Sequence, residues 1–297
     1  MPMPTPTLRQ LRTFLATVEA GGVSAAARAL HITQPAASQQ LRDLERALGV
    51  RLFERAGGKV MPTPAGEALL APARRCSAAV EDAVAATAEH RGGEAGRVRL
   101  GTGATACTSL LPPVLAAAKR AMPGLAVTVV IGNTADVVLR LEAGDLDAAL
   151  VTLPVPPGRA LSVTGVMVDP LVALLPEAAA PAGETVTAAQ LCALPLILFE
   201  AGGNSRTLVD AWFRRAGAAP RPIMELGSAE AIKRLVGAGL GGTVLTELAL
   251  RDPVPGAVTR GLDPAASREL GVVLRRDKVL DRGLRLFLAA LERAAAA

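Results

Sequence analysis

Residues 24–70 read SAAARALHITQPAASQQLRDLERALGVRLFERAGGKVMPTPAGEALL. A short helix with an alanine-rich body is expected over 24–30, with Ser24 as its N-cap. The tripeptide His31-Ile32-Thr33 interrupts it, and a second helix is expected over 34–48. Pro35 suits the first turn of that helix, because the N–H that proline lacks would have no partner there.

The residues on either side complete a small domain. Gly49 ends the second helix, and 51–62 contain two short extended pieces around Gly57-Gly58, a pattern typical of a hairpin or wing. Ahead of the quoted stretch, apolar side chains recur at helical spacing over residues 8–20. The order helix, helix, tight turn, helix, hairpin predicts a winged helix-turn-helix over residues 1–64, and hence a protein that binds duplex DNA.

The helix expected over 34–48 has one apolar and one polar face. At about 100° per residue, its core face consists of Ala37, Leu41, Leu44 and Leu48. The opposite face carries hydroxyl, amide and guanidinium groups, which pair with base edges and phosphates. Solvent exposure alone would explain any one of these polar residues, but not the order of the whole segment. The predicted DNA contacts are Ser24, Thr33, Gln34, Pro35, Ser38, Gln39, Arg42, Arg51 and Arg55.

These contacts divide into two kinds. The N-terminal part of the second helix of a helix-turn-helix enters the major groove. Base contacts are therefore expected from Gln34, Pro35, Ser38 and Gln39. Contacts to the DNA backbone are expected from Ser24, Arg42, Arg51 and Arg55. The charge distribution agrees, because residues 1–64 hold eight basic and four acidic side chains and so carry most of the net charge of +5.

The rest of the composition argues against several other classes of protein. Cys76, Cys107 and Cys192 are widely spaced, so neither a metal site nor a disulfide framework is expected. No apolar run approaches the length of a membrane span, and the N-terminus lacks the apolar core of a signal peptide. The motifs G-x-S-x-G and H-E-x-x-H are absent, and neither His31 nor His90 suggests a catalytic triad. We expect a cytoplasmic protein with no catalytic residues and no cofactor.

A long helix is expected from Ala65 to about Arg91, with Pro72 inside it as a point where it can bend or restart. Small and apolar side chains recur along it by fours and threes, as in a coiled coil: Leu69, Ala73, Cys76, Val80, Ala83 and Thr87. This apolar seam is expected to be buried, either against the rest of the same chain or against a second copy of it. We favour a homodimer, because regulators with one recognition helix per chain usually read two half-sites of an interrupted palindrome.

Beyond a glycine-rich hinge at Gly92-Gly93 and Gly96, the pattern changes to strands alternating with helices, which favours parallel α/β units. Strands are expected over 97–101, 126–131, 147–152, 194–199, 222–226 and 242–245. Helices are expected over 109–121, 134–143, 205–216, 228–238 and 281–295. This region of about 200 residues forms either one large domain or two lobes.

Residues 101–106 read GTGATA between an expected strand and an expected helix, which is formally the G-x-G-x-x-A pattern of a dinucleotide-binding turn. A nucleotide-dependent enzyme is therefore one alternative. It requires an acidic residue near the end of the next strand, where Ile131-Gly132-Asn133 stands instead. A solute-binding protein is a second alternative, and the lack of an export signal argues against it.

The same segment suits a ligand cradle better. Thr102, Thr105 and Thr108 place hydroxyls at a strand-to-helix turn, where unpaired backbone N–H groups favour an anion. Asn133-Thr134 stands at the end of the next strand, where Asn133 is equally suited to be an N-cap. Ligands collect at such strand ends in open α/β sheets. We expect a small carboxylate or another anion, held mainly by hydroxyls and backbone N–H groups.

The quoted stretch resembles the N-terminal region of LysR-type transcriptional regulators. The matching elements are Ala26-Ala27, Leu30, Thr33-Gln34-Pro35-Ala36, Ser38, Leu44-Glu45, Leu48-Gly49, Leu52-Phe53-Glu54-Arg55 and Thr63-x-Ala65-Gly66. The resemblance extends over nearly all 297 residues. It implies a winged helix-turn-helix over 1–64, a linker helix over 65–92 that pairs antiparallel with its mate, and an effector-binding domain over 93–297.

The effector domain of this family resembles a periplasmic binding protein, so the expected fold class is α plus α/β with two lobes. The resemblance implies that lobe I comprises 93–167 and 268–297, and lobe II 168–267. The residues implied to line the cleft are Thr102, Ala104, Thr105, Asn133, Thr152, Gly203, Ser205, Ser228 and Thr243. It further implies a dimer or a dimer of dimers that bends DNA and contacts RNA polymerase.

Overall fold

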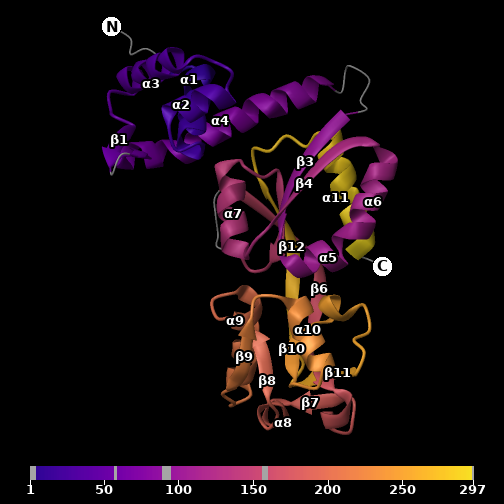
Figure 1. Cartoon of the computed structure of the whole chain (residues 1–297). Coiled ribbons are helices and arrows are strands. Elements are labelled where there is room, and N and C mark those ends of the chain that lie inside the picture. The colour runs from indigo at the N-terminus through magenta and orange to yellow at the C-terminus, as the bar shows by residue number, and fades with distance from the viewer. Residues whose placement is uncertain (1–4, 57–58, 89–94, 156–159, 296–297) are drawn as a thin grey trace. The chain divides into compact units, whose positions relative to one another are not determined.

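A computed structural model describes residues 5–56, 59–88, 95–155 and 160–295 (Figure 1). It divides into two compact units, the first made of 1–93 with 142–145 and the second of 94–141 with 146–297. Each unit has its own hydrophobic core. Within the described ranges, none of the helices is both long and apolar enough to span a membrane.

The first unit contains the elements that the sequence predicts for a winged helix-turn-helix. They are α1 (Leu8–Glu19), α2 (Val23–Ala29), α3 (Gln34–Leu48), the hairpin strands β1 (Phe53–Ala56) and β2 (Lys59–Pro62), and α4 (Pro64–Ala88). The two strands pair antiparallel, with Phe53 opposite Pro62. Gly57-Gly58, at the expected tip, lies outside the described residues.

The core of this unit forms where α1, α3 and α4 pack together. Phe14 is fully buried beside the ring of Phe53, with 5.4 Å between the ring centroids, so the first strand of the wing is packed against α1. Leu44 of α3 and Leu52 are buried in the same cluster. Burial of such side chains contributes about 1.5–3 kcal/mol each.

The helix-turn-helix differs from the expectation at two positions. Ser24 is not the N-cap of α2, because Gly22 occupies that position without a side-chain hydrogen bond. On α3, Ala47 is buried, whereas Leu48, expected on the core face, is only partly buried. The end of the helix explains this, since Gly49 adopts φ 70° directly after Leu48 and turns the chain away.

Helix α4 runs through Pro72 without a break between Pro64 and Ala88. Its N-terminal part is fixed in the unit, because Ala73 is buried in the core and Leu69 packs against it. Further along, Val80 is half-buried, and Cys76, Ala83 and Thr87 are exposed. The seam predicted along this helix is therefore only partly covered. The expected last turn up to Arg91, with His90 and the hinge glycines Gly92-Gly93, lies outside the described residues.

The second unit alternates strands and helices. Its strands are β3 (Ala95–Thr102), β4 (Gly124–Ile131), β5 (Ala148–Thr152), β6 (Leu161–Pro176), β7 (Thr185–Thr187), β8 (Leu196–Phe199), β9 (Pro222–Leu226), β10 (Thr243–Thr246), β11 (Ala257–Asp263) and β12 (Ser267–Arg275). Its helices are α5 (Ala104–Ser109), α6 (Leu111–Ala121), α7 (Thr134–Ala143), α8 (Ala188–Cys192), α9 (Asn204–Arg215), α10 (Ala229–Gly237) and α11 (Arg282–Ala295), with short 3-10 turns η2 (Glu177–Ala179) and η3 (Glu247–Leu250).

Strand β6 gives the unit its two lobes. Its first half pairs antiparallel with β12, and its second half pairs antiparallel with β10 and β11. The path β4-β3-β5-β12-β6-β11-β7 therefore continues from one lobe into the other. Lobe I adds the parallel pairs β3–β4 and β3–β5, and lobe II the parallel pair β8–β9.

The expectation of parallel α/β units is thus incomplete. The six expected strands correspond to β3, β4, β5, β8, β9 and β10, but β6, β7, β11 and β12 were not predicted. The expected helix over 109–121 corresponds to α6, and the short α5 ahead of it was not predicted; the two meet at Leu110. Leu110 and Leu111 are both fully buried, so the chain bends where it enters the core of lobe I.

A buried carboxylate ties three segments of lobe I together. Asp147 is 4% exposed and accepts hydrogen bonds from the backbone N–H and the guanidinium of Arg99 and from the ammonium of Lys278, at 2.7–3.3 Å. Burial by itself raises the pKa of Asp147, but the hydrogen bonds and charges of these two cations outweigh it and leave the pKa lowered.

We expect Asp147→Asn to lower the free energy of unfolding by about 3 kcal/mol at pH 7, because the buried Lys278 and the partly buried Arg99 lose their shared carboxylate. Since the folded-state pKa of Asp147 is depressed, its contribution is present above about pH 4 and is lost as the pH falls through the folded value. Urea unfolding between pH 7 and about pH 3 measures both the loss in free energy of unfolding and its dependence on pH. Asp277→Asn, at an exposed partner of Arg275, is the control and should cost less than about 1 kcal/mol. Equal losses for the two variants would contradict the role of Asp147.

Candidate functional site

Helix α3 is held in place by caps at both ends. The Thr33 hydroxyl accepts a hydrogen bond from the backbone N–H of Ala36, which makes Thr33 the N-cap, and Pro35 lies in the first turn. His31 adopts φ 54°, the left-handed conformation that lets the chain turn sharply from α2 into α3. These local features, all visible in the sequence, determine where the helix begins and which face it exposes.

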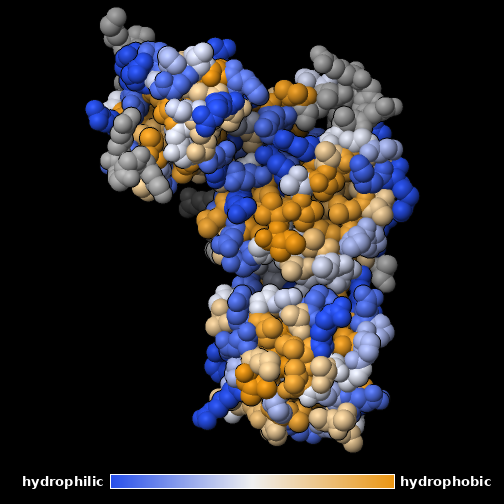
Figure 2. Space-filling view, viewed as in Figure 1, coloured by the Kyte–Doolittle hydropathy of each residue, from blue (hydrophilic) through white to orange (hydrophobic). Residues whose placement is uncertain are grey.

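The outer face of α3 is polar and exposed. Gln34, Pro35 and Gln39 are exposed, and Ser38 is half-buried. The Gln34 amide donates to the Ser38 hydroxyl at 3.2 Å, and Arg42 donates to the Gln39 amide oxygen at 2.7 Å. The structure therefore places four of the predicted base-contacting residues and Arg42 on one side of one helix. In Figure 2 hydrophilic side chains gather at the part of this unit that carries α1–α3.

The wing is attached to α3 by a carboxylate. Glu45 accepts a hydrogen bond from the backbone N–H of Leu52 at 2.8 Å, directly before β1 begins. Arg51 is exposed beside this anchor. Ser24 is exposed on α2. The side chain of Arg55 lies outside the described residues, so its predicted phosphate contact has no structural counterpart here.

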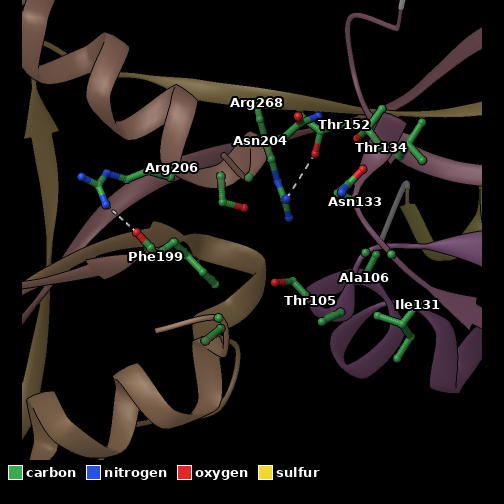
Figure 3. A pocket seen from close by; sticks show the side chains of 18 of the residues that line it. Thr105, Ala106, Ile131, Asn133, Thr134, Thr152, Phe199, Asn204, Arg206 and Arg268 are labelled. Carbon is green, nitrogen blue, oxygen red and sulfur yellow. Dashed lines mark hydrogen bonds between the residues drawn. The ribbon is translucent and has the colours of Figure 1, made fainter. Parts of the chain in front are cut away.

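The second unit contains a pocket of about 520 Å³ (Figure 3). Lobe I contributes the ends of β4 and β5 and the starts of α5 and α7, and lobe II contributes the end of β8, the loop into α9 and the start of α10. This volume is typical of sites for small organic ligands. The pocket thus lies at the ends of parallel strands, where open α/β sheets bind ligands.

The structure brings six of the nine predicted cleft residues to this pocket. They are Ala104, Thr105, Asn133, Thr152, Gly203 and Ser205. Asn133 also has the alternative role considered for it, because its side chain accepts a hydrogen bond from the backbone N–H of Asp136 at 2.9 Å. Helix α9 begins next to Gly203 without a side-chain cap, so its first N–H groups are available to a ligand.

Three predicted residues do not line the pocket. The Thr102 side chain is fully buried and donates to the Leu150 carbonyl at 2.8 Å, which joins β3 to β5. Ser228 is the N-cap of α10, where its hydroxyl accepts from the backbone N–H of Ala231. Thr243 is fully buried in β10. Side-chain alternation along a strand puts Thr102 and Thr243 toward the interior, a direction that residue type alone does not reveal.

The pocket has a charged residue that is not among the predicted cleft residues. Arg268, on β12, lines the pocket although only 8% of it is exposed. It forms an ion pair with Asp169 of β6, which is 1% exposed. Figure 3 shows its side chain extending toward the middle of the pocket, with a hydrogen bond to Thr152. The sequence offers little indication that Arg268 lines the pocket, because β6 and β12 are not among the predicted strands.

Arg206, the other arginine of the lining, has its charge balanced. Its guanidinium donates to Asp210, Glu225 and the Phe199 carbonyl at 2.6–2.9 Å. Burial by itself lowers the pKa of Arg206, but the two carboxylates outweigh it and raise the pKa. In Figure 3 the Arg206 guanidinium lies against Phe199. Arg206 therefore stabilises lobe II more than it offers a charge to a ligand.

A family model described as "LysR substrate binding domain" matches residues 91–296, and one described as "Bacterial regulatory helix-turn-helix protein, lysR family" matches residues 8–67. The chain belongs to the LysR family. It is a transcriptional regulator with an effector-binding domain, and its relatives are regulators and not enzymes.

Two relatives of this LysR-type regulator match it over most of their length. The HTH-type transcriptional regulator CbbR of Xanthobacter flavus is 32% identical over 93% of this chain and 85% of its own length. The HTH-type transcriptional regulator YeiE of Escherichia coli K12, described as uncharacterized, is 32% identical over 95% of this chain and 96% of its own.

Solved structures agree in fold. A single-residue variant of full-length OxyR from Pseudomonas aeruginosa superposes with a TM-score of 0.77 at 24% identity, covering 97% of this chain and 95% of that one. CbnR, a LysR family transcriptional regulator, superposes with a TM-score of 0.69 at 25% identity, covering 97% and 99%, and is also known in complex with its target DNA. The α plus α/β architecture with a two-lobed C-terminal domain is thereby confirmed.

Two threonines near the pocket can be compared, because the Thr102 hydroxyl is buried and the Thr105 hydroxyl lines the pocket. Thr102→Val should lower the free energy of unfolding of this LysR-type regulator by about 1–2 kcal/mol, because the buried Leu150 carbonyl loses a hydrogen bond. Thr105→Val, at a pocket-lining hydroxyl, should change it by less than about 0.5 kcal/mol. Urea unfolding compares the two. A larger loss at Thr105 than at Thr102 would show that the two roles are reversed.

Proposed function

We propose that this LysR-type regulator reads an interrupted palindrome as a homodimer and responds to a small anionic effector bound in the pocket of its second unit. The observation that carries the DNA-reading part is the outer face of α3, where four polar or small residues lie together at the N-terminal end of an exposed helix. In a helix-turn-helix this end enters the major groove.

On this proposal, Gln34, Pro35, Ser38 and Gln39 contact base edges. Glutamine pairs with adenine through both amide groups, and serine contacts several bases. Thr33, Ser24 and the cations Arg42, Arg51 and Arg55 contact the DNA backbone and fix the register. Glu45 holds the wing at the start of β1 and so positions Arg51 relative to α3.

Three groups of features support an anionic effector. The uncapped start of α9 offers N–H groups, Thr105, Thr152 and Ser205 offer hydroxyls, and Arg268 offers a guanidinium N–H. Binding to one arrangement of the lobes in preference to another would change DNA bending and contact with RNA polymerase. A regulator of DNA acts where the DNA is, in the cytoplasm.

The exposed part of the α4 seam supports a homodimer. Cys76, Ala83 and Thr87 are exposed on a helix whose Leu69 and Ala73 already pack in the core of the first unit. A second α4, antiparallel to the first, covers such a stripe and brings two copies of α3 to one DNA site. A dimer of dimers uses the same contact and adds a second one.

The reading of bases by α3 can be separated from attraction to phosphate. Gln34→Ala and Ser38→Ala should relax sequence choice at particular base pairs, each by about 1–3 kcal/mol. Arg51→Gln should weaken binding to all sequences and reduce the salt slope by about one unit. Fluorescence anisotropy with operator variants at several salt concentrations measures both effects. Arg140→Gln, an exposed arginine on α7, is the charge-matched control. Equal and sequence-blind losses for Gln34, Ser38 and Arg51 would refute the assignment.

The oligomer can be tested on the exposed seam. Ala83→Glu should convert dimers to monomers at micromolar concentration, because it buries like charges between two α4 helices. Thr87→Val is the matched control and should leave the dimer intact, since it keeps the shape of the side chain and adds no charge. Sedimentation equilibrium distinguishes the species. An unchanged dimer in Ala83→Glu would place the interface elsewhere.

A further inference from the structure

We infer that the effector is a small organic acid whose carboxylate binds Arg268, and that Asp169 positions the guanidinium for it. The inference rests on the proposed function, because it takes the pocket of the second unit as the effector site. It goes further by naming one residue as the anchor and one chemical class as the ligand. Arg268 belongs to no motif in the sequence, and it becomes visible only when β6 and β12 are paired.

The hydrogen bonds of Arg268 leave one donor for a ligand. Its Nε donates to Asp169 Oδ2 at 2.8 Å, and its Nη2 forms an ion pair with the same oxygen at 2.7 Å and donates to the Thr246 hydroxyl at 3.3 Å. Nη1 lies 3.4 Å from the Thr152 hydroxyl, a long contact. A guanidinium has five N–H bonds. Among the described residues, the second N–H of Nη1 has no acceptor, on a side chain that reaches into the pocket.

Asp169 keeps this donor in place. One of its oxygens accepts a hydrogen bond from Arg268 Nε and pairs with Nη2, and the other accepts the backbone N–H of Leu248 at 2.9 Å. The carboxylate is 1% exposed, so it is held on both sides and cannot turn toward solvent. The guanidinium edge that faces the pocket is therefore preorganised, which saves the entropy of ordering a long side chain when a ligand binds.

The charges around the pocket disfavour a ligand with more than one negative charge. Arg206 is already neutralised by two carboxylates, and Glu200 of the lining is itself acidic. Arg268 and Asp169 sum to zero, so a dianion such as phosphate would lie near a buried carboxylate without a second cation to balance it. A carboxylate carries one charge and accepts hydrogen bonds from both Nη1 and the neighbouring hydroxyls.

A second, smaller cavity beside the pocket indicates the chemistry of the part of the ligand beyond its carboxylate. It shares Thr105, Phe199 and Ser205 with the pocket, and otherwise its lining is almost wholly apolar: Leu171, Val209, Val244, Leu245, Thr246 and Ala249. Its volume is about 10 Å³, room for no more than about one water. Because none of the described residues that line this cavity is charged, it can accept only the tip of an apolar group and not a second carboxylate. The ligand class is therefore a monocarboxylic acid with an apolar part.

Matched pairs of acids and amides test the inference on the full chain. Acetate, propionate and butyrate are compared with acetamide, propionamide and butyramide at about 20 mM, with sodium chloride added to equal ionic strength, and inorganic phosphate is a separate arm. Because ligands that bind only the folded state stabilise it, an acid at about ten times its Kd should raise Tm by about 2–4 °C. The amides and phosphate should leave Tm within about 1 °C of the buffer value.

Two variants of the same strand assign the effect to Arg268. Arg268→Gln should abolish the rise in Tm with acids. Arg275→Gln is the matched control, because Arg275 is also a buried arginine of β12 but binds the carbonyls of Leu141 and Leu146 and not the pocket. It should lower the starting Tm and keep the full rise. If Arg268→Gln retains the rise, the inference is overturned.

A third variant keeps the test decisive if Arg268→Gln does not fold. Arg268→Lys keeps a cation beside Asp169 but lacks the planar fork that holds one donor toward the pocket, so the rise in Tm with acids should fall below about half of the wild-type shift. An undiminished shift overturns the inference. So does a shift as large with amides or phosphate as with acids, or no shift with any probe. Specific, salt-sensitive DNA binding by the same preparation would leave the regulator proposal standing in each of these cases.

Discussion

The pairing of β6 with β12 is the constraint on which the second unit depends. β6 spans Leu161–Pro176, and its two halves belong to different lobes, so each core is built on part of the same strand. At the crossing, Asp169 and Arg268 lie on neighbouring strands and bind each other in the interior. Their burial costs free energy, and the additional bonds to Leu248, Thr152 and Thr246 offset part of that cost.

This arrangement links ligand binding to the geometry of the lobes. Thr152 ends β5 in lobe I, and Thr246 ends β10 in lobe II, so the guanidinium of Arg268 touches both. A ligand at Nη1 therefore acts where the two lobes meet and not on one wall of the pocket. Regulation requires a ligand that distinguishes two arrangements, and a group shared by both lobes is a physical means of doing so.

The structure of the DNA-reading unit depends mostly on residues that are close together in the sequence. Thr33 caps α3, Pro35 opens it, Gly49 closes it, and the apolar spacing of Leu41 and Leu44 determines which face is buried. Each of these signals lies within a few residues of its effect. For this reason the bounds of α3 were predicted to the residue, and the polar face opposite the core could be named in advance.

The sequence by itself determined the family, the winged helix-turn-helix, the face of α3 and most of the strand ends that surround the pocket. Tertiary structure alone decided which hydroxyls reach that pocket. Thr102 and Thr243 point into the cores because strand side chains alternate between two faces, and Ser228 is used as a cap. It also decided the role of Arg268, whose partner Asp169 is 99 residues away in the chain. Periodicity reports only neighbours along the sequence, whereas this pair exists because two antiparallel strands bring distant residues into register.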